Sequence, residues 1–448
     1  MVKTVYGLME GIDHGTYTEY RRVPYAKPPV GELRLRRPVK PEPWEGIYQA
    51  KEYAPCCMQD ENRAGEPWAK DFYADPAFLR PSSEDCLYLN IWAPKDTDPA
   101  EKYPVAFWIH GGAFLGGFAT ELEFDGAEYA KRGVILVSVE YRCNLFGYMA
   151  HPWLSAEDEE GISGNYGSYD QLAALDWVIE NIPAFGGDAS NITVFGQSAG
   201  AMSTQTLVSS PLSRGKIAKA IFQSGGSYGI GFHNDMPMKT AEHYGELLTD
   251  MLGIGSLEEL RRIPEKELMA DCMAWMGKLM QTGEAKGLFL TPNMDNKLLT
   301  QGYYETVDNN SLLDIPYMVG WTADDMDVQG PDRAYKDADA PETMLKAGSL
   351  ALAERLRDLG RPGAYVYAFN RKLPGDGWGA YHSSELFYVF GTLSRTWRPF
   401  TEGDYALSSR MIDYWTNFMK TGDPNAQGLP QWNAYRKEAP FIMELDVE

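Results

Sequence analysis

The chain has 448 residues, of which 44% are hydrophobic and 13% aromatic, enough for a large buried core. Its 63 acidic residues outnumber its 41 basic ones, and the net charge of −22 argues against binding to nucleic acid or to an anionic membrane surface. No stretch is apolar enough to span a bilayer and no signal peptide is visible at the start, so we expect a cytoplasmic protein.

The five cysteines, an odd number in a long chain, do not form a disulfide framework. Cys56 and Cys57 are adjacent, and Cys86 can pair with either of them in an oxidising compartment. Without a signal peptide we expect reduced thiols. No cysteine or histidine group has zinc-binding spacing and no His-Glu-x-x-His sequence occurs, so we predict no metal and no cofactor.

In chain order, short apolar runs bounded by glycine or polar turns predict parallel strands covered on both faces. These runs are 105–110, 134–141, 192–195, 220–223, 315–319 and 364–369. Apolar residues at helical spacing predict a helix over 169–182, which Pro183 ends. The alternation of strand and helix indicates an α/β fold with a mainly parallel sheet.

Residues 227 to about 310 have a different pattern. Amphipathic segments at 240–252 and 265–280 are rich in methionine, and we find no convincing strand among them. We interpret this region as a helical excursion from the sheet that caps the functional site. The whole chain, 1–448, is expected to form one domain.

The stretch FGQSAGA at 195–201 places Ser198 between Gly196 and Gly200, directly after a predicted strand. A helix-compatible segment, 199–208, follows it. This is the Gly-x-Ser-x-Gly pattern of a nucleophile elbow, in which a strained turn lifts the serine hydroxyl between a strand and a helix. The context favours a nucleophilic serine over an ordinary tight turn.

A nucleophilic serine needs a base that takes its proton. In the elbow fold the chain order is serine, acid, histidine, which leaves His233, His243 and His382 after the serine. His233 and His243 fall in the helical excursion, whereas His382 follows the last predicted strand across a glycine-rich loop. We therefore choose His382 as the base.

The acid should follow the strand predicted at 315–319. Position alone leaves three candidates open, namely Asp324, Asp325 and Asp327. The donors that stabilise an oxyanion are backbone N–H groups, and HGGAF at 110–114 matches the glycine-rich oxyanion loop of esterases. No Lys-Ser or Lys-Thr follows this loop, which disfavours a phosphate-binding loop.

Taken together, these motifs resemble the type-B carboxylesterases, the branch of the α/β-hydrolases that includes the cholinesterases. The resemblance covers nearly the whole chain. The occurrence of all these motifs in the family's order is far more specific than any single motif. It is carried by RRVPYAKPPVGELRLRRPVKPEPW at 21–44, SEDCLYLNIW at 83–92, HGGAF at 110–114, EYRCNLFGY at 140–148, GNYGSYDQLAALDWVIENIPAFGGDASNITVFGQSAG at 164–200 and YHSSELFYVFG at 381–391.

The resemblance implies a serine carboxylesterase that hydrolyses carboxylic esters through an acyl-enzyme on Ser198, with His382 as general base. The family's acid aligns with Asp325, where glutamate is common, and Asp324 is the alternative. The N–H groups that would hold the oxyanion belong to Gly112, Ala113 and Ala199. Two other functions stay open, amide hydrolysis by the same triad and a non-catalytic binding module. The sequence does not indicate an oligomeric state.

Two departures from the cholinesterases bear on the substrate, a small-molecule ester. Gln197 stands where they carry a glutamate, and residues 75–78 replace the segment with their choline-facing tryptophan. A quaternary ammonium would lose both partners, so we do not expect choline esters to be preferred. Pocket candidates by their position next to the motifs are Phe114, Leu115, Trp321 and Tyr381.

Overall fold

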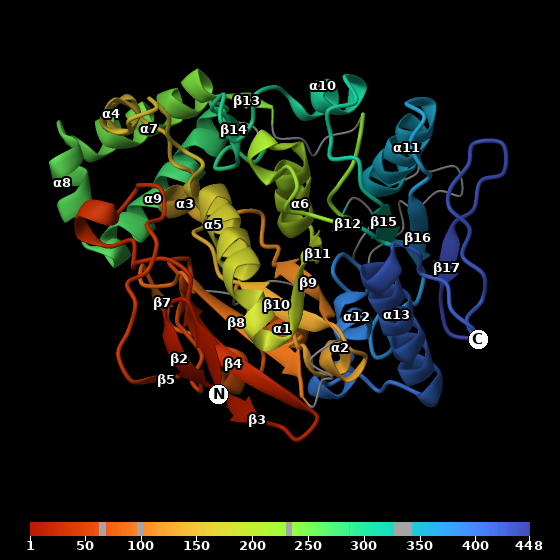
Figure 1. The fold of residues 1–448 in the computed structure, drawn as a ribbon. Coiled ribbons are helices and arrows are strands. Elements are labelled where there is room, and N and C mark those ends of the chain that lie inside the picture. The colour runs from red at the N-terminus through yellow and green to blue at the C-terminus, as the bar shows by residue number, and fades with distance from the viewer. Residues whose placement is uncertain (62–68, 96–101, 230–234, 286, 327–342) are drawn as a thin grey trace.

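A computed structural model describes residues 1–61, 69–95, 102–229, 235–285, 287–326 and 343–448. Within these residues a ten-stranded sheet runs through the molecule (Figure 1). Its strands, in spatial order, are β17 (Met443–Leu445), β16 (Tyr365–Phe369), β15 (Tyr317–Thr322), β12 (Lys219–Gln223), β11 (Gly187–Gln197), β9 (Tyr103–Ile109), β10 (Ile135–Val139), β8 (Tyr88–Pro94), β4 (Tyr17–Pro24) and β3 (Ile12–Asp13). From β17 to β10 neighbouring strands are parallel, and β8, β4 and β3 extend the sheet in antiparallel fashion.

Strand β9, in the middle of the sheet, is apolar along its length because both faces of the sheet are covered. In β9 the side chains of Val105, Phe107 and Ile109 join one buried cluster, and Ala106 and Trp108 join another. This period of two is the geometry of a strand, whose successive side chains point to opposite faces. Helices α5, α6 and α11 cover the first face, and α2, α12 and α13 cover the second (Figure 1).

The helices have the following bounds. They are α1 (Ala69–Phe72), α2 (Ala127–Lys131), α3 (Asn144–Tyr148), α4 (Pro152–Glu157), α5 (Tyr166–Asn181), α6 (Ala199–Ser209), α7 (Met238–Leu252), α8 (Leu257–Arg262), α9 (Glu265–Thr282), α10 (Tyr303–Asp308), α11 (Met344–Asp358), α12 (Leu386–Phe390) and α13 (Glu402–Thr421). No helix in the described ranges is long and apolar enough to cross a membrane.

The mainly parallel α/β sheet predicted from the sequence is confirmed, and each of the six predicted strands overlaps an observed one. Two predictions need correction. The run at 134–141 was expected to be one strand, but β10 ends at Val139, and Tyr141 instead stacks on His110 and donates its O–H to the His110 carbonyl at 2.9 Å.

The region 227–310 was expected to lack strands, yet it contains β13 (Met236–Pro237) and β14 (Asn293–Met294), which pair with each other. Two residues are too short to leave a periodicity in the sequence. The remaining strands, outside the large sheet, are β1 (Val2–Thr4), β2 (Gly7–Glu10), β5 (Ile47–Gln49), β6 (Cys56–Cys57) and β7 (Ser82–Ser83).

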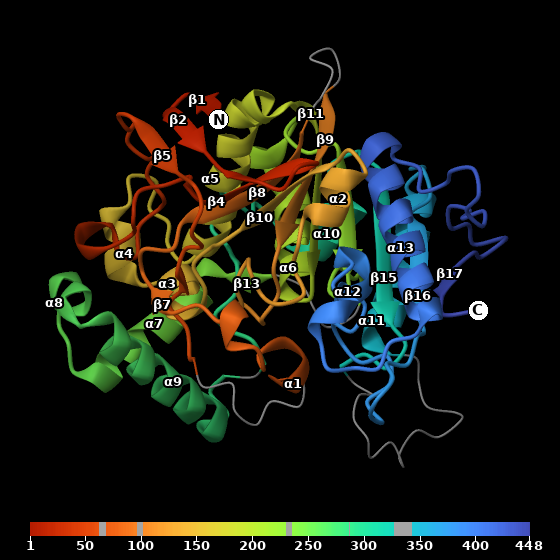
Figure 2. The same cartoon turned by 90° about the horizontal axis from the view of Figure 1, so that it is seen from below.

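Helices α7, α8 and α9 lie together at one side of the molecule, away from α13 (Figure 2). Their apolar side chains form a third cluster with residues next to the serine elbow, including Phe114, Ala199 and Met202. Leu268, Cys272 and Trp275 line the buried face of α9 at spacings of three to four residues, so this helix is held by one amphipathic stripe.

A disulfide joins Cys57 to Cys86 across 29 positions of the sequence. This bond corrects the expectation that these thiols are reduced. Of the two possible partners of Cys86, namely Cys56 and Cys57, it is Cys57 that forms the bond. Cys56 does not compete because its Sγ donates to the carbonyls of Arg80 and Pro81. The disulfide closes the segment that contributes one wall of the cavity described below.

Candidate active site

Ser198 stands at the turn between β11 and α6, at the carboxyl end of a central strand. Its backbone has φ 56° and ψ −125°, a region that residues other than glycine rarely adopt. The Ser198 N–H donates to the Gln223 carbonyl at 2.9 Å, and its own carbonyl accepts from Met202 N at 3.0 Å. The neighbouring strand and the first turn of the helix therefore hold the serine in a strained position.

The two glycines around the serine are required by close backbone crossings. A Cβ atom on Gly200 would lie 2.0 Å from the carbonyl oxygen of Ile109, at the end of β9. On Gly196 it would lie 2.3 Å from the Gly200 carbonyl oxygen. Both distances are far inside van der Waals contact, so any side chain at either position would push the elbow away from β9.

His382 and Asp325 form a buried hydrogen-bonded pair. His382 follows β16 in a long loop, Asp325 follows β15, and Nδ1 of the imidazole lies 2.5 Å from Oδ1 of the carboxylate. The Asp325 side chain is completely buried and accepts further N–H bonds from Met326 at 2.9 Å and Thr322 at 3.2 Å. Three donors thus fix the orientation of this carboxylate.

The other candidates for acid and base have different surroundings. Oδ2 of Asp324 accepts the N–H of Ala380 at 2.9 Å, which ties the loop before the histidine to the end of β15. His243 is exposed on α7, with its Nδ1 3.9 Å from Glu246. Asp327 and His233 lie outside the described residues.

The pair changes the pKa of both members. Burial lowers the pKa of His382, but the Asp325 carboxylate and, to a smaller extent, Glu385 together raise it by more, so the net value lies above the ordinary 6.5. Burial alone would raise the pKa of Asp325, but His382 and the surrounding N–H donors outweigh it and bring the pKa below its usual 3.8. Asp325 is therefore ionised wherever the protein is folded at neutral pH.

The second imidazole nitrogen of His382 faces the amide side chain of Gln197. In the sequence this residue stood out only as a difference from the cholinesterases. Nε2 of Gln197 lies 3.2 Å from Nε2 of His382. Because the amide nitrogen can only donate, this imidazole nitrogen accepts and the ring proton resides on Nδ1, facing Asp325. This is the tautomer in which Nε2 can take a proton from a hydroxyl group.

The glycine-rich turn after β9 presents its backbone to the same space. Gly112 has φ 104° and Ala113 has φ 57°, so consecutive residues adopt left-handed conformations. Two buried side chains hold this turn. Asn144 donates to the Leu115 carbonyl at 3.2 Å, and Gln59 accepts from Gly117 N at 2.9 Å and donates to the Gly117 carbonyl at 3.0 Å.

Ala199, the third predicted donor, is the first residue of α6 and is buried. The first N–H groups of a helix have no acceptor within the helix, so its N–H is available to a ligand.

A cavity of about 380 Å³ opens at the serine. Its wall comes from several separate segments, and it is mostly apolar apart from the catalytic candidates and a group of carboxyl side chains. The lining residues are Asp60, Phe72, Tyr73, Gly111, Gly112, Ala113, Leu115, Gly116, Glu121, Glu123, Phe124, Gln197, Ser198, Met273, Met326, His382, Ser383 and Leu386.

Of the four predicted pocket residues, only Leu115 lines this cavity. Phe114 packs edge-on against Tyr148 in the cluster beneath the cap, with ring centroids 5.1 Å apart. Trp321 is buried in the core on one face of β15. Tyr381 is buried on the other face of the sheet and donates its O–H to Asp71 at 2.8 Å.

Glu385 is a functional candidate that the sequence reasoning missed. It lies three residues after His382 and is completely buried, with no hydrogen-bond partner for either carboxyl oxygen among the described residues. Burial and the nearby Asp325 charge raise its pKa to about 7, against an opposing effect of His382. It follows the predicted base within YHSSELFYVFG, and an acidic residue inside this otherwise apolar run was the available signal.

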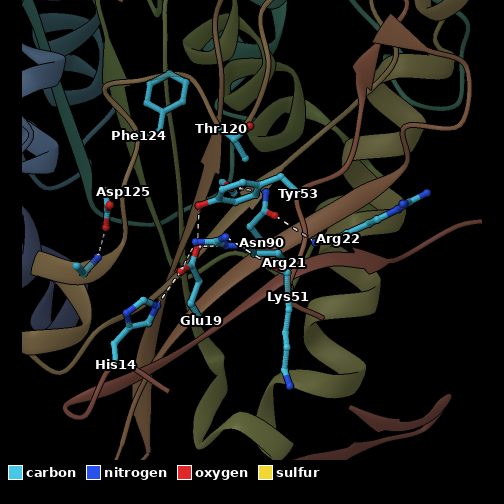
Figure 3. A network of polar contacts seen from close by, with 12 residues as sticks. His14, Glu19, Arg21, Arg22, Lys51, Tyr53, Asn90, Thr120, Phe124 and Asp125 are labelled. Atoms are coloured by element: carbon cyan, nitrogen blue, oxygen red, sulfur yellow. Dashed lines mark hydrogen bonds and ion pairs between the residues drawn. The ribbon is translucent and has the colours of Figure 1, made fainter. Parts of the chain in front are cut away.

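A second cavity, of about 400 Å³, shares Phe124 with the lining of the first. Figure 3 shows its polar network. Glu19, only 3% exposed, accepts from His14 Nε2 at 2.9 Å, from Arg21 Nε at 2.7 Å and from the Tyr53 O–H at 2.7 Å. Its charge is matched by protein partners, so this network ties β4 to the segment at Tyr53.

The described ranges contain no group of three or more His, Cys, Asp or Glu side chains that could hold a metal ion. The first cavity offers a hydroxyl group, an imidazole–carboxylate pair and backbone N–H donors. These are the parts needed for nucleophilic acyl transfer.

The mainly parallel sheet, with a serine at a strand–helix elbow, defines an α/β-hydrolase. Comparison with known proteins gives the branch. Residues 1–343 and 337–448 match the carboxylesterase family, and the chain belongs to that family. It is accordingly a carboxylic ester hydrolase of the serine esterase type.

Its relatives are similar over their full length. The para-nitrobenzyl esterase of Bacillus subtilis is 33% identical over 493 residues, which span 100% of this chain and 95% of the relative. Carboxylesterase 4A of Bos taurus is 30% identical over 528 residues, spanning 100% of this chain and 91% of the relative. The solved structure of a thermophilic PNB esterase superposes with a TM-score of 0.84 at 31% identity, covering 99% of this chain and 95% of that one.

Proposed function

We propose that Ser198, His382 and Asp325 form the catalytic triad of this esterase. The observation that carries the proposal is the 2.5 Å contact between His382 Nδ1 and Asp325 Oδ1, in a loop that also lines the cavity of Ser198. Asp324 is bound to the backbone of Ala380 and is the weaker candidate for the acid.

In the first step Ser198 Oγ attacks the ester carbonyl carbon while its proton passes to His382 Nε2. The hydroxyl group must first replace the Gln197 N–H at this nitrogen. Asp325 stabilises the imidazolium that forms and holds its tautomer. The oxyanion of the tetrahedral intermediate accepts hydrogen bonds from the N–H groups of Gly112, Ala113 and Ala199, each worth about 3–4 kcal/mol in comparable sites.

The intermediate collapses when His382 gives its proton to the leaving alcohol oxygen, and the acyl group remains on Ser198. Water then attacks the acyl-enzyme, with His382 again taking the proton, and the carboxylic acid leaves. The net reaction consumes one ester and one water and produces one acid and one alcohol. No residue of the chain is changed at the end of the cycle.

The proposal includes the architecture and the location expected from the sequence. Residues 1–448 form one α/β-hydrolase domain in which the helical region 227–310 acts as a cap, supported by Met273 of α9 in the cavity wall. A cytoplasmic location stays a prediction, and the Cys57–Cys86 disulfide supplies its test because such a bond persists only under oxidising conditions.

The test of the proposed triad is Ser198→Ala. Hydrolysis of p-nitrophenyl butyrate should fall by about 10⁴- to 10⁶-fold in kcat, because removal of a triad member leaves only binding and the oxyanion donors. The melting temperature should remain close to that of the wild type, and EDTA should leave the wild-type rate unchanged. Activity within tenfold of the wild type would remove Ser198 from the mechanism.

A further inference from the structure

The second cavity, which shares Phe124 with the active-site cavity, is lined by more positive than negative charge. Its volume is about 400 Å³. The fixed charges in its lining come from three arginines and two acidic side chains, namely Arg21, Arg80, Arg395, Glu19 and Asp125. The described lining therefore holds one guanidinium group more than it holds carboxylates.

Two of the three arginines are each matched by a carboxylate. Arg21 donates to Glu19 through Nε at 2.7 Å and through Nη2 at 3.0 Å (Figure 3). Arg395 pairs with Asp125 in the same way, one guanidinium group to one carboxylate. The charges of these two pairs cancel, and the guanidinium group of Arg80 supplies the excess.

Arg80 has no carboxylate partner among the described residues. Its Nη1 donates to the carbonyls of Ala77 at 3.0 Å and Leu79 at 3.1 Å, and its Nε donates to Oγ1 of Thr120 at 3.3 Å. All three acceptors are neutral, and Nη2 has no acceptor in the described part of the chain. The nearby carboxyl group of Glu140 does not neutralise Arg80, because burial raises the pKa of Glu140 to about 8 and keeps it mostly protonated at neutral pH.

A second positive charge lies close to Arg80. The guanidinium carbon of Arg80 is 4.6 Å from the centre of the Tyr53 ring, and the guanidinium carbon of Arg21 is 4.0 Å from the same centre. Burial lowers the pKa of Arg80, and the Arg21 charge adds to this effect while Tyr53 opposes it. A half-buried cation beside a second cation is stabilised by an anion that binds it.

Thr120 offers a second hydrogen-bond donor at the same place. It lines the cavity and is only 7% exposed. Its Oγ1 accepts the Nε–H of Arg80, and the hydroxyl proton has no acceptor among the residues that the structure describes. A buried donor without an acceptor costs free energy unless a ligand supplies the acceptor. Arg80 and Thr120 are therefore two adjacent groups that each have a donor left for a ligand.

The charge of the lining favours a ligand with a single negative charge. A carboxylate has two oxygens, which can accept from Nη2 of Arg80 and from the Thr120 hydroxyl group at once. Phosphate carries more than one negative charge at neutral pH, and the two carboxylates of the lining repel the additional charge. The rings of Tyr17, Phe78 and Trp92 also line the cavity and can contact an organic group attached to the carboxylate.

We propose that the second cavity binds an organic monocarboxylate, held by Nη2 of Arg80 and the hydroxyl group of Thr120. Neither residue lines the cavity of Ser198, so the site is separate from the triad and the inference does not depend on the proposed function. Hydrolysis of a carboxylic ester releases a ligand of this class, since the acid produced is ionised at neutral pH.

The experiment measures the binding of butyrate to the whole chain by titration calorimetry. Because butyrate can also bind as a product at Ser198, each titration is repeated after inactivation with diethyl p-nitrophenyl phosphate, which blocks a reactive serine. Butyramide is the neutral ligand of the same shape, and inorganic phosphate is the anion of higher charge. All solutions have the same ionic strength, since salt screens the attraction between charges.

The inactivated enzyme should bind one butyrate, with a Kd at least about tenfold below that of butyramide, and Arg80→Gln should raise this Kd by about tenfold to a hundredfold, as expected for a hydrogen bond to a charged group. Thr120→Val keeps the side-chain shape and should raise the Kd by about twofold to tenfold. Arg214→Gln is the matched control, since Arg214 is exposed and outside the cavity. It removes the same charge from the chain and should keep the wild-type Kd.

Three outcomes would overturn the inference. One is the loss of butyrate binding on inactivation, which would place the ligand at Ser198 alone. Another is the same Kd in Arg80→Gln and Arg214→Gln, and the third is binding of phosphate at least as tight as that of butyrate. If the organophosphate does not react, the proposed function fails, whereas the effect of Arg80→Gln on the untreated enzyme still tests this site.

The position of the ligand can be determined without any variant. Crystals of the wild type soaked in para-bromobenzoate should show the anomalous signal of bromine in the second cavity, with the carboxylate within hydrogen-bond distance of Arg80 Nη2. A signal found only elsewhere in the molecule would contradict the proposal.

Discussion

Replacement of Asp325 by asparagine tests the assignment of the acid without a change in side-chain size. The carboxylate receives three N–H groups, from His382 Nδ1 at 2.5 Å, Met326 at 2.9 Å and Thr322 at 3.2 Å. An asparagine side chain offers one acceptor oxygen and one NH₂ group. At least one of the three donors must therefore face another donor.

The magnitude follows from which donor loses its acceptor. If the NH₂ group faces His382, the ring proton moves to Nε2, and this nitrogen can no longer accept the serine proton. The same change in a related triad lowers kcat about 10⁴-fold, equal to about 5.5 kcal/mol of activation free energy. If the NH₂ group instead faces Thr322, one buried N–H is left unpaired at a cost of about 1–3 kcal/mol in stability.

The assay is steady-state hydrolysis of p-nitrophenyl butyrate, with the melting temperature of each variant measured in parallel. Asp324→Asn is the matched control. Oδ2 of Asp324 accepts the N–H of Ala380, and an amide oxygen can keep that bond. We expect Asp325→Asn to fold and to be nearly inactive, and Asp324→Asn to keep kcat within about tenfold with a lower melting temperature. The reverse result would refute the assignment of the acid.

Three further predictions concern pH, packing and redox state. Since the pKa of His382 lies above 6.5 and only its neutral form accepts a proton, kcat/KM should fall as pH decreases through that raised pKa, and a flat profile down to about pH 5 would exclude an imidazole base. The stability that follows from the raised pKa of His382 is full below the unfolded pKa of histidine and is lost as pH rises through the folded pKa, whereas the stability from the lowered pKa of Asp325 is full above the unfolded carboxyl pKa and is lost as pH falls through the folded one. Gly200→Ala should reduce the free energy of unfolding by about 3 kcal/mol or more in urea titrations, because the new Cβ would lie 2.0 Å from the Ile109 carbonyl oxygen. The control is Gly277→Ala on α9, which has open space around it and should be neutral or stabilising. Reduction of Cys57–Cys86 should lower stability by about 3 kcal/mol, and alkylation of the unfolded protein taken directly from cells should label three thiols if the bond is formed and all five if it is reduced.

The parts of the fold that the sequence revealed are those whose geometry leaves a local pattern. Central strands such as β9 are covered on both faces and appear in the sequence as continuous apolar runs. Strand β4 escaped detection because it mixes Arg21, Arg22 and Glu19 with apolar residues near the edge of the sheet. Glu19 pairs with Arg21 inside the strand, but its burial also depends on the Tyr53 hydroxyl, which lies 34 positions away and outside any local window of the sequence.

The residues of the site also divide into those that the sequence could predict and those that it could not. The elbow and the oxyanion turn could be predicted because the backbone crossings demand glycine or small residues in sequence. Glu121 and Glu123 could not, since acidic residues in a loop are usually solvated and only the fold turns these two inward. Nearness along the chain also misled the prediction for Trp321, because consecutive side chains of a strand point to opposite faces.

The cavity of this enzyme has reacting groups and walls that are supplied by different parts of the chain. The serine, histidine and aspartate follow strands of the sheet, whereas Met273 belongs to α9 and Asp60 to the segment closed by the disulfide. A change at Met273 alters neither a backbone crossing at the elbow nor the three N–H groups that fix Asp325. Libraries that vary Met273, whose side chain is exposed, should therefore yield folded enzymes with new ester preferences, while the same diversity at Gly196 or Gly200 should yield mostly inactive chains.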